Sequence, residues 1–140
     1  MPGIRQGGKH KDSIQFLILT LRGVADSWEK LTTEDQIQQI IDRSRQPGIN
    51  GVVIFKHSTR CSISSMALSR MERGWKFDKE QLPLFFLDLL AFRPLSSKVS
   101  EVFDIRHESP QILLIKDGRC IYNASHSEVS PQNIGVFLGI

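Results

Sequence analysis

The chain has 140 residues, of which 40% are hydrophobic and 24% are charged, and its formal net charge is +3. This composition is typical of one globular domain with a single core, and it argues against nucleic-acid binding because no Lys/Arg-rich stripe is present. Two cysteines are too few for a disulfide framework, and no apolar run approaches the ~20 residues needed to cross a bilayer, so we expect a cytoplasmic protein without a membrane partner.

The beginning of the chain differs from the rest. Residues 1–26 show no persistent helical or strand period, and we expect them to form an N-terminal extension, partly disordered. We place the domain at residues 27–140, with a short strand at Trp28–Leu31.

Apolar runs and one turn signal predict the remaining strands. Val52–Phe55 and Leu84–Leu87 are short continuous apolar runs, which are typical of buried central strands. Asp117-Gly118 separates two further apolar stretches and is a strong hairpin signal. Because helical patterns alternate with these strands, the sequence predicts an α/β fold with a parallel core and an antiparallel edge.

Four segments have helical periodicity. They begin at the capping-box pattern Thr33–Gln36, after Cys61, near Pro94 and at Ser130-Pro131. The apolar residues expected on their inward faces are Ile37, Ile40 and Ile41 in the first helix, Ile63, Met66, Ala67 and Met71 in the second, Leu95, Val99, Val102 and Phe103 in the third, and Ile134, Phe137 and Leu138 in the fourth.

Cys61 is the most informative single residue. It follows the polar loop His57–Arg60 and stands directly before a predicted helix, where amides and the helix dipole stabilise a thiolate. Such placement can lower a cysteine pKa from about 8.5 to roughly 3.5–7.5. Arg60 adds a permanent charge next to it, and Lys56 or His57 is a candidate for another. The alternative is a buried core cysteine, but the polar neighbours favour a reactive thiol.

Cys61 to Ser64 has the pattern C-x-x-S. In a C-x-x-C pair the second thiol resolves a mixed disulfide. Ser64 can hydrogen-bond to the Cys61 thiolate but cannot attack a disulfide, so a second thiol must come from solution or from a partner. On spacing alone, Ser64 is also explained as a solvated helix residue. The Ser109–Pro110 bond could be cis, although composition alone favours an ordinary turn.

Three stretches resemble the monothiol bacilliredoxin family: Val53–Leu68, Ser109–Gln111 and Ala124–Ser127. The resemblance runs from about Trp28 to the end of the chain. It implies a thioredoxin-like fold with a mixed four- to five-stranded sheet flanked by helices. It also implies exchange with protein–bacillithiol mixed disulfides, with bacillithiol as co-substrate and no tightly bound cofactor.

The resemblance also assigns roles to residues. By position, Cys61 is the nucleophile, Ser64 is the non-resolving residue, and Pro110 is a cis proline facing the nucleophile. We expect the small thiol to lie across the carboxyl ends of the parallel strands. The residues predicted to bind it or the protein substrate are His57, Thr59, Ser109, Pro110, Ser125, His126 and Ser127, with Arg60 assisting catalysis. Arg60, His126 and the amides near Ser127 are candidates for the carboxylates of bacillithiol, although His126 is equally well explained as an exposed loop residue.

Other functions are less consistent with the sequence. The spacing of Cys61, Cys120, His57 and His107 matches no paired zinc-ligand pattern, and no phosphate-binding glycine motif is present. We expect Cys120 to be a structural strand cysteine rather than a resolving one. The remaining alternative is a non-catalytic thioredoxin-like binding or redox-sensing module, which would not require a rapidly alkylating Cys61.

Overall fold

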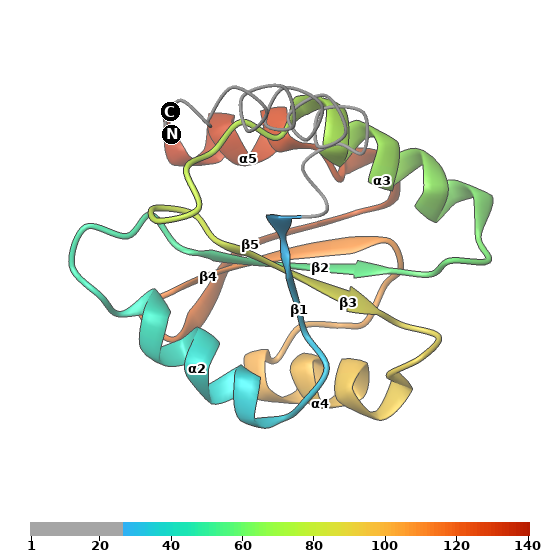
Figure 1. Ribbon diagram of the computed structural model, residues 1–140, viewed down its shortest axis with the longest axis horizontal. Coiled ribbons are helices and arrows are strands. Elements are labelled where there is room, and N and C mark those ends of the chain that lie inside the picture. Colours follow the sequence, from blue (N-terminus) through green and yellow to red (C-terminus); the bar gives the residue numbers. More distant parts are fainter. Residues whose placement is uncertain (1–26) are drawn as a thin grey trace, which may run out of the picture.

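A single mixed sheet organises the protein. The computed structural model describes residues 27–140, and the predicted extension at 1–26 lies outside the described residues. The strands are β1 (Glu29–Lys30), β2 (Val52–His57), β3 (Leu84–Asp88), β4 (Gln111–Lys116) and β5 (Arg119–Ser125). Their order is β1-β3-β2-β4-β5, in which β1, β3 and β2 are parallel and β4 runs antiparallel to both β2 and β5 (Figure 1). The predicted parallel core and antiparallel edge are confirmed.

Helices cover both faces of the sheet. α2 (Asp35–Ser44) and α4 (Arg93–Phe103) lie on one face, and α3 (Ser62–Gly74) and α5 (Pro131–Leu138) lie on the other, with the short 3-10 helix η2 (His126–Glu128) before α5 (Figure 1). Since strand side chains alternate, β2 contributes Phe55 to the core beneath α3 and Ile54 to the core beneath α4. The result is a three-layer arrangement with two separate hydrophobic cores.

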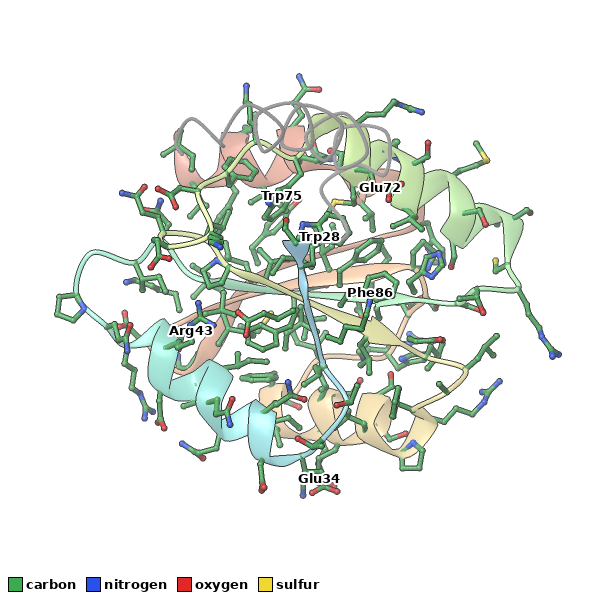
Figure 2. The ribbon with its side chains drawn as sticks, viewed as in Figure 1. Trp28, Glu34, Arg43, Glu72, Trp75 and Phe86 are labelled. Atoms are coloured by element: carbon green, nitrogen blue, oxygen red, sulfur yellow. The ribbon has the colours of Figure 1, made fainter. Side chains whose placement is uncertain are left out.

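Aromatic rings fill the layer beneath α3. Trp28 lies edge-on to Trp75, with ring centroids 6.0 Å apart, and stacks on Phe86 at 6.3 Å (Figure 2). Trp28 and Trp75 are 7% and 9% exposed. Trp28, directly before β1, therefore ties that edge strand to the layer of α3 and α5.

The sequence contained local signals for one hairpin and for caps at the starts of α2 and α5, and the structure confirms most of them. The hairpin is confirmed, because Asp117 and Gly118 both have positive φ, as a two-residue turn of this kind requires. The Ser130 side chain accepts from the Asn133 amide at 3.1 Å, which confirms the cap of α5. At α2 the Gln36 side chain does reach back to the Thr33 amide at 3.0 Å. A capping box also requires the Thr33 hydroxyl to accept from the Gln36 amide, and this half of the prediction is wrong. The hydroxyl lies 3.4 Å from the Gln36 side-chain oxygen, to which it can only donate.

The predicted inward faces were wrong at four residues. Ile63 and Met66 of α3 are 51% and 63% exposed, Val102 is 40% exposed and Phe137 is 47% exposed. In α3, Ala67 and Met71 are buried as predicted, and the third buried residue is Ser64. The small side chains of Ser64 and Ala67 let the start of α3 lie close to the sheet, and this turns its large apolar side chains outward.

Candidate functional site

The candidate site lies at the edge of the sheet where β2 and β3 end. β2 leads through a short turn to Cys61, which is the N-cap residue of α3 (Figure 1). The Cys61 amide donates to the Ser58 carbonyl at 3.2 Å, and the Cys61 carbonyl accepts from Ser65 at 3.0 Å. Cys61 therefore begins the helix, and the first amides that follow it have no main-chain acceptor. Its side chain lies beside these unpaired amides. The predicted strand-to-helix placement of Cys61 is confirmed.

The electrostatics of Cys61 favour the thiolate. The backbone of Ser64 and then that of Ile63 lower the pKa of Cys61 by hydrogen bonding to its sulfur, burial opposes them, and the Ser64 hydroxyl adds a further lowering. The Cys61 side chain is partly exposed and can be reached from solution. A helix N-terminus and one neighbouring hydroxyl therefore hold a nucleophilic sulfur at the surface.

Ser64 lies close to this sulfur, since both its backbone and its hydroxyl lower the pKa of Cys61. The residue is 0% exposed, and its hydroxyl has no well-formed hydrogen bond within the described part of the chain. A hydroxyl that lacks another partner is available to donate to the Cys61 thiolate when the proton leaves. This buried position differs from the solvated helix residue that spacing alone allowed.

Cys120 lies at the opposite end of the sheet. It pairs with Ile115, which is opposite Val52 at the start of β2, whereas the site lies beyond the end of β2. Six residues of strand at about 3.3 Å each make roughly 20 Å, far beyond the ~7 Å that a disulfide allows between Cα atoms. Burial raises the pKa of Cys120, and its thiol donates to the Tyr122 carbonyl at 3.3 Å. It is therefore a structural cysteine.

The residues before Cys61 do not supply the second charge that the sequence suggested. Thr59 and Arg60 are exposed, and neither Arg60 nor Lys56 is among the causes of the lowered Cys61 pKa. His57 is only 3% exposed, and burial lowers its pKa, with Asp88 and the Ser64 backbone opposing that shift. Because its pKa is lowered, the imidazole of His57 is neutral near pH 7. The prediction that His57 is a candidate for a second positive charge beside Cys61 is therefore wrong. The ring lies beneath the site against Phe55 and Phe86.

The second half of the site comes from β4 and η2. The register pairs Gln111 with both Lys56 and Ser125, which brings Ser109–Pro110 to the end of β2 from which the Cys61 loop departs. The Ser109–Pro110 bond is cis, as the family resemblance implies. His126, whose φ of 54° is left-handed, donates its amide to the Pro110 carbonyl at 3.0 Å.

Charges near His126 bear on anion binding. The His126 ring lies 3.7 Å from the Glu108 carboxylate, so a protonated His126 is partly neutralised there. Arg70 of α3 donates to the carbonyls of His126 and Val129 at 2.8 and 3.1 Å and thereby fixes η2. Ser125 is half-buried and Ser127 is exposed at the two ends of this turn. Arg60, at the surface, takes part in no ion pair of the described residues.

Sequence reasoning misjudged two groups of residues around the site. Ile63 and Met66, about one helical turn apart, are exposed in the first turns of α3, directly after Cys61. Lys56 and Gln111 are fully buried polar residues under the Pro110 loop. The outward pair could not be found from hydrophobicity, which assigned both residues to the core.

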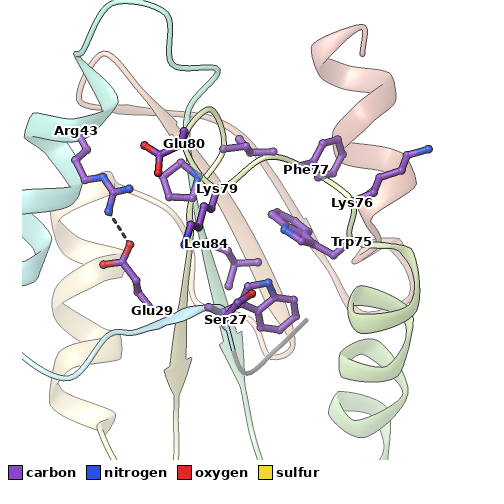
Figure 3. A pocket seen from close by; sticks show the side chains of 12 residues that line it. Ser27, Glu29, Arg43, Trp75, Lys76, Phe77, Lys79, Glu80 and Leu84 are labelled. Atoms are coloured by element: carbon purple, nitrogen blue, oxygen red, sulfur yellow. Dashed lines mark hydrogen bonds and ion pairs between the residues drawn. The ribbon is translucent and has the colours of Figure 1, made fainter. Parts of the chain in front are cut away.

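A cavity away from this site lies at the other end of the parallel strands. It has a volume of about 560 Å³ and borders the amino ends of β1 and β3, with the Arg43–Glu29 ion pair of 2.6 Å across its rim and Trp75 and Phe77 on its wall (Figure 3). None of its lining residues belongs to the predicted site. In residues 27–140 no three metal-binding side chains cluster, and no helix there is long and apolar enough to span a membrane.

Comparisons with known proteins agree with this geometry. Residues 29–134 match the family model described as monothiol bacilliredoxin BrxC. Among solved structures, a proposed oxidoreductase with a thioredoxin fold is 23% identical, with a TM-score of 0.64 over 80% of this chain and 93% of that one. Thioredoxin from Trypanosoma brucei brucei is 12% identical, with a TM-score of 0.61 over 81% and 92%. At these identities the structures show the thioredoxin fold.

Proposed function

Because the chain belongs to the monothiol bacilliredoxin family and is in general terms a thiol oxidoreductase, we propose that it removes bacillithiol from protein mixed disulfides through Cys61. The observation that carries this proposal is the placement of Cys61 at the N-terminus of α3, where main-chain amides lower its pKa. Ser64 stands where a dithiol enzyme has its second cysteine. A monothiol reaction follows from this pair of residues.

The proposed chemistry has two exchanges. In the first, the Cys61 thiolate attacks the bacillithiol sulfur, the protein–sulfur bond breaks, and the protein leaves as a thiolate that takes a proton from water. Cys61 is then joined to bacillithiol by a disulfide. In the second, a free low-molecular-weight thiolate attacks that disulfide, forms an oxidised small-thiol pair and releases the Cys61 thiolate.

Two surfaces beside Cys61 support contact with such a substrate. Ile63 and Met66 offer exposed apolar area to the protein part of a mixed disulfide. Arg60, His126 and the amides near Ser127 offer positive charge or N–H groups to the carboxylates of bacillithiol. The main chain of Ser109, beside the cis bond, has no hydrogen bond within the described residues and can pair with an extended peptide.

The test measures release of a protein thiol from one model protein carrying either bacillithiol or glutathione. Wild type should release the thiol faster from the bacillithiol form, and mass spectrometry should find bacillithiol on Cys61. Cys61→Ser should abolish release, and Cys120→Ser, the matched control, should not. If the Cys61→Ser variant releases the protein thiol as fast as wild type, the proposal is wrong. An adduct on Cys61 without repeated turnover would indicate a redox-sensing module.

A further inference from the structure

Two buried polar side chains lie next to each other on the face of the sheet covered by α4. Lys56 of β2 and Gln111 of β4 are register partners, and they are 0% and 1% exposed. Register partners of an antiparallel pair direct their side chains to the same face. Buried polar groups cost free energy unless they are hydrogen-bonded, so the partners of these two residues show what they hold.

Both side chains hold the segment between α4 and β4. The Gln111 side chain accepts from the Glu108 amide at 3.3 Å and donates to the Arg106 carbonyl at 2.9 Å. The residue between Arg106 and Glu108 in the sequence is His107, and its Nδ1 lies 3.3 Å from the Lys56 ammonium. Three consecutive residues are therefore held from below by two neighbouring side chains.

Lys56 also joins this segment to α4. Its ammonium donates to the Ser96 carbonyl at 3.2 Å and to the Ser100 hydroxyl at 2.8 Å. No carboxylate is among its partners in the described chain, and burial lowers its pKa to about 8. A buried lysine without a counter-ion is costly, so this residue is poorly explained by stability alone.

The held segment leads directly to Ser109–Pro110, whose far side is fixed by the bond from His126 to the Pro110 carbonyl. We propose that Lys56 and Gln111 are positioning residues for thiol–disulfide exchange: by holding residues 106–108, they set the Ser109–Pro110 main chain opposite Cys61. This inference rests on the proposed function. Neither side chain touches the reacting sulfurs, so their effect passes through the loop.

The contact between Lys56 and His107 makes the arrangement sensitive to pH. His107 can accept from the ammonium only while Nδ1 is unprotonated. The charged groups acting on His107 are Lys56 of β2 and Arg93 of α4, which oppose its protonation, and Glu108 of the same loop, which favours it. When His107 gains a proton, two positive charges face each other and the loop loses this anchor.

The experiment compares two reactions of Cys61 in Gln111→Met and Lys56→Met. Alkylation by iodoacetamide requires only the thiolate, whereas exchange with a protein mixed disulfide requires the loop as well. Exchange should fall about ten- to a hundredfold because the loop is displaced, while alkylation stays within about twofold of wild type. The exposed substitutions Gln39→Met and Lys79→Met are the matched controls, for which both rates should stay unchanged.

His107 supplies a second test that does not depend on a buried substitution. His107→Ala should lower exchange, and His107→Gln should restore it, because a glutamine oxygen also accepts from Lys56. In wild type the ratio of exchange rate to alkylation rate should fall as the pH drops below about 6.5, because burial and Lys56 hold the pKa of His107 below that ordinary value, whereas in His107→Gln it should stay flat.

The outcomes separate the two proposals. If wild type exchanges and the folded Gln111, Lys56 and His107 variants exchange equally well, this inference is overturned and the proposed function stands. If exchange and alkylation fall together, the substitutions have disturbed Cys61 itself, which also overturns the inference. If wild type shows no exchange with any protein mixed disulfide, the proposed function fails and this inference fails with it.

Discussion

Lys56 and His57 are consecutive residues of β2, both are buried, and their side chains enter opposite layers of the protein. Lys56 bonds to Ser96 and Ser100 of α4, whereas the His57 ring packs against Phe55 and Phe86 beneath α3. The two ionisable groups are separated by the sheet. Substitutions at one therefore leave the surroundings of the other intact, and each can be tested alone.

His57→Phe should stabilise the protein by roughly 1 kcal/mol at pH 7, because neither ring nitrogen has a well-formed hydrogen bond within residues 27–140. The folded pKa lies below the ordinary value of 6.5. In wild type the titration of His57 therefore leaves stability unaffected above about pH 6.5 and lowers it as the pH falls from there through the folded pKa, because the unfolded chain takes up the proton first. Urea unfolding between pH 5 and 8 measures this difference. A variant less stable than wild type at every pH would contradict the prediction.

Ser64→Ala should raise the apparent pKa of Cys61, because it removes the hydroxyl that stabilises the thiolate. The rise should be partial, since the backbone of Ser64, the larger cause, remains. Arg60→Ala should shift the pKa less than Ser64→Ala, because Arg60 is not among the causes of the lowering. Iodoacetamide alkylation rate against pH gives the value, with exposed Ser62→Ala as the control. A larger shift for Arg60→Ala than for Ser64→Ala would refute this order.

Ser64→Cys should convert the site to a dithiol. Residues 61 and 64 span the first turn of α3, where side chains three positions apart are neighbours, so oxidation should join them. Thiol counting and peptide mapping after mild oxidation detect the bond. Ser69→Cys, placed farther along the same helix, is the control and should keep both thiols. Two free thiols at 61 and 64 after oxidation would show that the helix start is misplaced.

Substitutions at Arg60 and His126 should weaken exchange with bacillithiol mixed disulfides more than exchange with a neutral small disulfide, because only the former offers carboxylates. His126→Asn is preferred to alanine, since asparagine tolerates the left-handed φ of 54°. Glu108→Gln removes the carboxylate 3.7 Å from His126 and should have the opposite effect. Comparing kcat/KM for the two substrates gives the answer. Equal losses for both would exclude these residues from carboxylate binding.

The order of elements could be predicted from sequence because each turn and cap has its own chemistry. Asp117-Gly118 and Ser130-Pro131 are such local signals, and both are confirmed. β2 was expected to end at Phe55, since Lys56 and His57 are polar. The strand continues through both residues because Lys56 finds partners in α4 and His57 finds aromatic rings. Such partners come from distant parts of the chain and leave no local pattern.

The site was predictable only in part for the same reason. The position of Cys61 follows from local order, whereas the outward direction of Ile63 and Met66 depends on how closely α3 approaches the sheet. Hydrophobicity assigned both residues to the core, and the small Ser64 took the buried place. The cis bond at Pro110 came from the family resemblance, because composition does not distinguish it from a turn.

The separation of Cys61 from Cys120 has a further consequence. On the proposed function, Ser64 cannot expel a captured small thiol and Cys120 is too distant to do so. The adduct on Cys61 therefore persists until an external thiol arrives, and its lifetime depends on the concentration of that thiol. At steady state the fraction of Cys61 that carries the adduct rises with the ratio of thiolated proteins to free small thiol. The same cysteine that would release protein thiols would therefore also report, through its adduct fraction, how oxidised the thiol pool is.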